Sequence, residues 1–252
     1  MFKRYIVSSQ LSERKVAILG FHKIGAPPLH GWETWFYIPE ETFASQLSYL
    51  KENRWQVIDL AAFMRGLKSP ESLPERSALL TFDDGYRTMR EVALPWLRRF
   101  DYPAVLFVPT NYIGGRSLFG LDEEPEEAIC DWDDLRELET NGVAVQSHSA
   151  SHRPFSELNA AEQEEELIKS KSVLEARLNR AVEFFSFPYG DNGTDPELTR
   201  CALERAGYRA ACLYGGGPEV LPVTDAFQLS RLAMGPDTDL REELAEGVLQ
   251  HG

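Results

Sequence analysis

Short apolar runs rich in valine, isoleucine, phenylalanine and tyrosine recur along the chain, and most are continuous rather than alternating with polar residues. Continuous runs are typical of parallel strands that are covered on both faces. The pattern therefore predicts eight strands, over residues 16–22, 55–60, 78–83, 104–109, 143–148, 182–188, 208–214 and 227–234.

Helical patterns separate these runs. They predict helices over residues 41–53, 90–100, 132–142, 159–179 and 195–207. The longest of these helices has Asn159 and Glu162 in capping-box spacing. The helices predicted over 132–142 and 195–207 end at glycine. Strands alternate with helices to the end, without a linker or a change of composition. We expect one α/β domain over residues 1–252 with its core at about 16–235, in which seven to eight parallel strands form a closed or nearly closed, TIM-like barrel rather than an open sheet.

Charge narrows the range of partners. The chain has 26 basic and 40 acidic residues, a formal net charge of −14. A surface this negative lacks the cationic stripe that binds phosphates, so we expect no nucleic-acid partner and no anionic membrane partner. It suits a neutral substrate, or one whose product becomes an amine. The acidic runs at 121–128 and 162–167 indicate solvated faces.

Cysteine usage and the start of the chain bear on location. Cys130, Cys201 and Cys212 have no Cys-x-x-Cys spacing, which indicates reduced thiols rather than a disulfide framework. Residues 1–15 contain no apolar run of signal-peptide length, and no stretch is long enough to span a membrane. These features predict a cytoplasmic protein without membrane insertion.

Reactive side chains follow three of the predicted strands. Asp83 and Asp84 end the third, His148 and His152 follow the fifth, and Tyr189 follows the sixth. The carboxyl ends of parallel barrel strands share one rim, so these groups are expected to meet. Two imidazoles and one carboxylate form a three-ligand set with open positions for water and substrate, which favours Zn²⁺, or Fe²⁺, Co²⁺ or Ni²⁺, over Mg²⁺ or Ca²⁺.

The two adjacent aspartates then have different roles. One ligates the ion, and the other is a general base for a water whose pKa the ion lowers from about 15.7 to roughly 7. The residues alone do not say which aspartate has which role. The backbone N–H of Tyr189 is a candidate donor to a developing oxyanion. The parts together predict hydrolysis of an amide or ester.

The motifs resemble a known family. "TFDDGY" at 81–86, "HSASH" at 148–152 and "FPYG" at 187–190, in this order, are similar to the polysaccharide deacetylases (NodB-homology domain, carbohydrate esterase family four). The segments "ILGFHKIG" and "LSRLAM" extend the likeness over about 16–234, and the N-terminal part looks most like the poly-N-acetylglucosamine deacetylases.

The resemblance implies a distorted (β/α) barrel that holds a divalent metal, usually zinc, and removes acetyl groups from N-acetylated sugars. It implies Asp83 as the catalytic base and Tyr189 as the oxyanion donor. The metal ligands that it implies are Asp84, His148 and His152.

Two positions depart from the family pattern. The family usually has an arginine two residues before the proline of the third motif, where it orients the base; this chain has Ser186. The family also has a late histidine as general acid, whereas the only histidine after His152 is His251. His22, at the end of the first predicted strand, is a candidate substitute or a structural side chain, and proton return by Asp83 is a third option.

Two other functions remain open from the sequence. One is a barrel that keeps the metal site but only binds glycans, since the family-type acid is missing. The other is an amidohydrolase of the same fold that acts on a small amide, which the lack of an export signal favours. An aspartyl-phosphate site and an Fe²⁺ oxygenase fit less well, because the paired histidines and the strand–helix alternation argue against them.

Overall fold

The computed structural model describes residues 14–120 and 124–245. His251 and most of the segment used for the leader prediction lie outside them. Nine strands form the main sheet, in the order β10-β1-β5-β6-β7-β8-β9, with β4 beside β5 and β11 beside β1. These strands are β1 (Arg14–Phe21), β4 (Gln56–Val57), β5 (Arg76–Phe82), β6 (Ala104–Val108), β7 (Val143–Ser147), β8 (Phe184–Ser186), β9 (Ala210–Cys212), β10 (Glu219–Leu221) and β11 (Leu232–Ala233).

The sheet curls until its last strand reaches its first. Every pairing is parallel except that of β10 with β1. The segment 229–233 pairs at Leu229 with Cys212 of β9, and at Leu232 with Leu19 of β1. It therefore joins the two ends of the sheet, and the predicted distorted (β/α) barrel is confirmed. All eight predicted strands are present, although several are only two or three residues long; β10 was not predicted.

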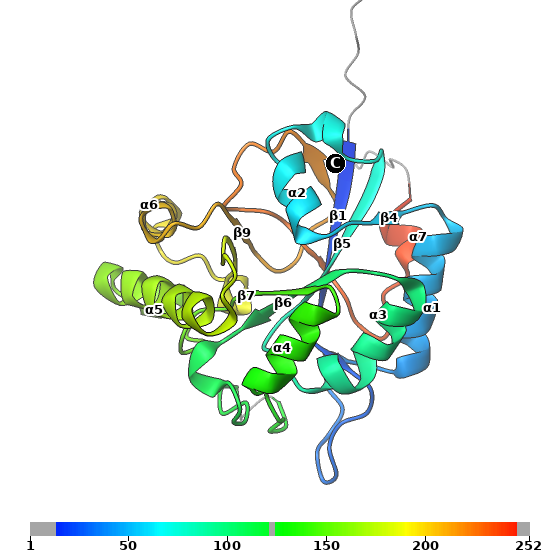
Figure 1. The fold of residues 1–252 in the computed structure, drawn as a ribbon, viewed down its shortest axis with the longest axis horizontal. Helices are drawn as coiled ribbons and strands as arrows, with labels where there is room; N and C mark the ends of the chain where they lie inside the picture. Colours follow the sequence, from blue (N-terminus) through cyan, green and yellow to red (C-terminus); the bar gives the residue numbers. More distant parts are fainter. Residues whose placement is uncertain (1–13, 121–123, 246–252) are drawn as a thin grey trace, which may run out of the picture.

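Helices flank the outside of the curled sheet (Figure 1). They are α1 (Glu40–Glu52), α2 (Leu60–Gly66), α3 (Leu94–Phe100), α4 (Trp132–Thr140), α5 (Ala160–Leu178), α6 (Pro196–Ala206) and α7 (Leu240–Glu243). A π-helical turn, Met89–Ala93, leads into α3. The five predicted helices are confirmed, and α5 begins with the predicted capping box of Asn159 and Glu162.

Helix α2 replaces the end of a predicted strand. Within the apolar run at 55–60, only the two residues of β4 pair with β5. The run then leaves the sheet, because the Asp59 side chain accepts a hydrogen bond from the backbone N–H of Ala62 and starts α2. Among the described residues, no helix combines the length and the apolar character needed to cross a membrane. The three cysteines are free, with Cys130 and Cys212 buried.

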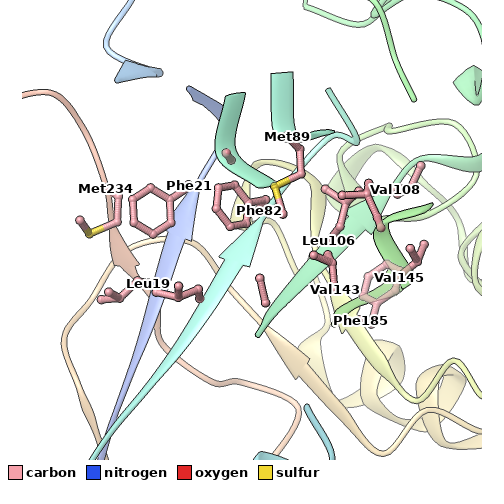
Figure 2. Packing of buried hydrophobic residues seen from close by; sticks show 14 of the residues in the cluster. Leu19, Phe21, Phe82, Met89, Leu106, Val108, Val143, Val145, Phe185 and Met234 are labelled. Atoms are coloured by element: carbon pink, nitrogen blue, oxygen red, sulfur yellow. The ribbon is translucent and has the colours of Figure 1, made fainter. Parts of the chain in front are cut away.

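The strands bury both of their faces. Outward side chains such as Leu19, Phe82 and Val145 belong to the larger apolar cluster, which is seen at close range in Figure 2 and extends to the helices. Alternate side chains point into the barrel and form a second cluster, which Phe63 and Met64 of α2 close at the amino-terminal end. Two-sided burial explains why the strands read as continuous apolar runs.

Candidate metal centre and active site

The inward face of the barrel changes from apolar to polar toward its carboxyl end. Strand side chains alternate between faces, so the positions two or four residues beyond a buried interior residue also point inward. Asp83, for example, follows Leu79 of the interior cluster by four residues. The polar layer that results contains His22, Asp83, His148, Ser186, Tyr214 and Arg231. The fold thus converts strand periodicity into one ring of reactive groups.

Asp84, His148 and His152 converge on one point. The Asp84 Oδ1 atom lies 3.3 Å from His148 Nε2 and 3.0 Å from His152 Nε2, and all three side chains are buried. Ligand atoms about 2.1 Å from a common ion are separated by roughly 3.0–3.4 Å. Asp84 Oδ1 has no hydrogen-bond donor among the described residues. The spacing and this unsatisfied oxygen both fit a divalent transition metal.

The backbone after β5 brings Asp84 to this point. Asp84 and Gly85 both have positive φ, 70° and 71°. A Cβ atom at Gly85 would lie 2.9 Å from the Val108 side chain, so only glycine fits the turn. The "DDG" motif is therefore a tight turn that directs the two carboxylates to different positions.

The two histidines are held differently. The His148 Nδ1 donates to the backbone oxygen of Ser186 at 2.7 Å, which leaves the lone pair of Nε2 for a metal. The His152 ring stacks on Phe119 with ring centres 4.0 Å apart, and its Nδ1 has no partner in the described part of the chain. Burial favours a higher pKa for Asp84, but the charge of His152 and the nearby His148 side chain outweigh it and hold this pKa well below its usual range.

A carboxylate supports the loop that carries His152. Ser149 and His152 have φ of 66° and 60°, which is unfavourable for residues with side chains. Glu166 of α5 accepts the backbone N–H groups of Ala150 at 2.7 Å and Ser151 at 2.8 Å, and the Ser151 hydroxyl at 2.7 Å. The prediction that 162–167 is only a solvated face is wrong at Glu166, because this side chain turns inward to the loop.

Arg231 orients Asp83. Its guanidinium is completely buried and binds both Asp83 oxygens at 2.7 Å. Its three other N–H donors reach Thr81 Oγ1 at 3.3 Å, Ser186 Oγ at 2.9 Å and the Leu213 carbonyl at 2.7 Å, so all five donors are used. Burial would raise the pKa of Asp83, but the Arg231 charge outweighs it and the pKa is lowered.

Sequence reasoning missed this residue. The resemblance indicated that Ser186 stands where the family has an arginine that orients the base; in the structure Arg231 supplies a guanidinium from the segment 229–233 and also contacts Ser186. The only signal was its place in "LSRLAM", an arginine in a run that otherwise reads as a buried strand. Buried arginines are rare unless paired, so a carboxylate partner could have been expected.

His22 lies beside the base. Its Nε2 is 4.0 Å from Asp83 Oδ2, and its ring packs against Phe36 and Tyr214 with centres 4.6 and 5.1 Å away. Burial lowers the pKa of His22 despite the nearby carboxylates. Its Nδ1 and the Tyr214 hydroxyl are buried without a hydrogen-bond partner among the described residues. The sequence placed His22 on this rim but did not single out Tyr214.

Tyr189 borders the site from the turn Pro188–Gly190. Its φ is 58°, its ring meets His152 edge-on at 4.8 Å, and 55% of it is exposed. Trp132, the first residue of α4, packs on the core beneath Arg177, whose guanidinium lies 4.7 Å from the ring.

All the predicted site residues line one pocket of about 210 Å³. Lys23 and Glu124 also line it and form an ion pair, with Lys23 almost fully buried. The prediction of a solvated face at 121–128 is therefore wrong at Glu124, and also at Glu127, which is buried and accepts the Tyr37 hydroxyl at 2.7 Å. A larger hollow of about 670 Å³ lies beside α2 and contains none of the predicted site residues.

Several known proteins are similar to this chain in sequence. The Bacillus subtilis protein YxkH is 25% identical over 195 residues, which are 77% of this chain and 63% of YxkH. A Staphylococcus aureus poly-beta-1,6-N-acetyl-D-glucosamine N-deacetylase is 26% identical over 210 residues, which are 80% of this chain and 69% of that protein. The chain thus spans about two thirds of the length of these relatives.

Solved structures share the fold. The Streptococcus pyogenes deacetylase PplD in complex with acetate has a TM-score of 0.78 at 21% identity, over 92% of this chain and 97% of that chain. IcaB from Ammonifex degensii has a TM-score of 0.75 at 21% identity, over 92% and 95%. The family model for polysaccharide deacetylase matches residues 71–211, more than half of the sequence. The chain belongs to the polysaccharide deacetylase family, whose members depend on a metal, and its Asp-His-His cluster can hold one.

Proposed function

We propose that the protein is a metal-dependent deacetylase that removes acetyl groups from an N-acetylated amino sugar in a glycan or glycan precursor. The observation that carries this proposal is the ordered carboxylate of Asp83 directly beside the Asp84, His148 and His152 cluster. The name of the Staphylococcus aureus relative, a poly-beta-1,6-N-acetyl-D-glucosamine N-deacetylase, supports an N-acetylated amino sugar as the substrate class. The negative net charge suits a neutral substrate.

The three clustered side chains hold a divalent transition metal, and Zn²⁺ is the first choice for two imidazoles and a carboxylate. Co²⁺, Ni²⁺ and Fe²⁺ suit the same donors. When bound, the ion supplies a more acidic water and polarises the amide carbonyl.

Asp83 is the general base. Arg231 and burial fix its carboxylate in one orientation, and the lowered pKa keeps it ionised at neutral pH. It accepts the proton of the attacking water as the new C–O bond forms. The backbone N–H of Tyr189 donates to the acyl oxygen as negative charge develops there, a contribution of about 3 kcal/mol for one such donor.

His22 relays the proton to the leaving nitrogen. A neutral imidazole cannot give up its single proton at this pH, so it must receive one first. Nε2 faces Asp83 and takes the proton that the base has accepted, while Nδ1, which has no hydrogen-bond partner among the described residues, donates to the amine. The C–N bond then breaks, and acetate and a free amine leave. His22→Ala is expected to slow turnover and alter its pH profile; an unchanged rate and profile would remove His22 from the mechanism.

Acetate release tests the proposed function. Protein reconstituted with Zn²⁺ is assayed on substrates that range from N-acetylglucosamine oligomers to small acetamides, with Asp83→Asn as the control. We expect acetate from the sugars, the same metal content in both proteins, and almost no turnover by the variant. Full activity of the Asp83 variant would end the general-base assignment.

The same experiment separates the alternatives. A glycan-binding barrel would take up metal and bind sugar oligomers without releasing acetate. A small-amide hydrolase would prefer the acetamides.

A further inference from the structure

The active-site pocket is too small for more than one sugar unit. It encloses about 210 Å³, below the roughly 300–1,000 Å³ of pockets that enclose drug-sized ligands. If the substrate is a glycan, as the proposed function holds, its neighbouring sugar units must lie over the rim.

An exposed tryptophan continues one wall of the pocket outward. Phe36 lines the pocket, with its ring 4.6 Å from that of His22. Trp35 packs edge-on against Phe36, with ring centres 5.7 Å apart, yet 39% of it is exposed. Both residues end the loop between β2 (Lys23–Ile24) and β3 (Tyr37–Ile38), which projects beyond the carboxyl ends of β1 and β5 (Figure 1).

The indole is held in one orientation. Its Nε1 donates to Asp237 Oδ1 at 2.7 Å. A Cβ atom at Gly235 would lie only 2.2–2.6 Å from three atoms of the indole, so the ring rests directly on the backbone of this glycine. A ring already fixed by its neighbours loses little conformational entropy when a ligand covers it.

We propose that Trp35 is a stacking platform for the sugar unit next to the one that is deacetylated. The face of a pyranose ring that carries only C–H groups is apolar and weakly electropositive, which complements the negative face of an aromatic ring. The occupant is the same N-acetylated chain whose reacting unit fills the pocket, because the Trp35 surface is continuous with the pocket through Phe36. The site thus favours oligosaccharides of two or more units over a single sugar.

The test compares kcat/KM for N-acetylglucosamine oligomers of one to five units. Trp35→Ala is expected to lose about tenfold on oligomers, equivalent to about 1.4 kcal/mol, and less than twofold on the monomer. Trp35→Phe, which keeps a ring, is expected to retain most of the activity. Trp96→Ala is the matched control, because the Trp96 indole also donates to a carboxylate, Glu40 at 2.7 Å, but lies on α3 away from the pocket. It should leave every substrate unchanged.

Binding provides a second readout. In the Asp83→Asn background, affinity for the trimer is measured by calorimetry with and without Trp35→Ala, and we expect a tenfold weakening. Equal losses on monomer and oligomer, or no loss on either, would overturn the platform while leaving the deacetylase intact. Absence of acetate release and binding with every glycan would overturn the proposed function, and the platform with it.

Discussion

Replacing Arg231 tests how the catalytic base is held. Arg231→Ala removes both charged hydrogen bonds to Asp83. Among the described residues it leaves that carboxylate, 3% exposed, with the Ser186 hydroxyl at 3.4 Å and His22 at 4.0 Å. Removing one partner of a buried ion pair costs about 3–5 kcal/mol. A domain is typically stable by about 5–15 kcal/mol, so the variant should fold but be clearly weakened.

The stability that Arg231→Ala loses should depend on pH, and the structure predicts the direction of this dependence. In the parent protein the Asp83 pKa is lowered, so this carboxylate adds stability above its unfolded pKa and the contribution is lost as pH falls through the folded pKa. Without Arg231, burial prevails and raises the pKa of Asp83. The charged carboxylate then destabilises the fold at neutral pH, and this penalty disappears as acid protonates it. The loss in Arg231→Ala should therefore be largest near neutral pH and shrink toward acid.

Chemical denaturation of metal-free protein measures this effect. Arg231→Ala, Asp83→Asn and the double variant form a cycle, and we expect the double variant to lose less than the sum of the single losses, because neither charge is left alone. Arg231→Lys keeps a charge but not the two-pronged contact, so it should recover much of the stability and little of kcat. The reasoning is refuted if Arg231→Ala loses less than about 1 kcal/mol and retains parental turnover.

Three further predictions concern other side chains. His148→Ala should lose Zn²⁺ in equilibrium dialysis because one of three ligands is gone; retention of parental affinity would contradict the cluster. Glu166→Ala should weaken metal affinity about tenfold or more, as expected when groups that support a ligand are lost, and unchanged affinity would show that the loop keeps its shape unaided. Tyr214→Phe should unfold at an equal or higher denaturant concentration than the parent, because the buried Tyr214 hydroxyl has no hydrogen-bond partner among the described residues. The control Tyr208→Phe should lose about 1 kcal/mol of stability, because the Tyr208 hydroxyl donates to the Leu167 carbonyl. Equal losses of stability in the two variants would contradict this.

The predictable parts of the site follow from local pattern. Continuous apolar runs located the strands, and the strand ends located Asp83, Asp84, His148 and His152, because parallel strands end on one side. The pairing of Arg231 with Asp83 could not be read this way, since 148 residues separate them along the chain. The prediction of solvated faces was wrong at Glu124 and Glu166 for a related reason. An acidic run has the same sequence pattern whether all of its side chains face water or one turns inward.

The position of Arg231 in the chain links the orientation of the catalytic base to the closure of the barrel. Arg231 lies in the segment 229–233, which pairs with β9 on one side and with β1 on the other. The metal ligands come instead from the loops after β5 and β7, near the middle of the sheet. From this position the guanidinium contacts both Asp83 and Ser186 of β8. The orientation of the base therefore depends on the segment that closes the barrel, whereas none of the three metal ligands comes from that segment.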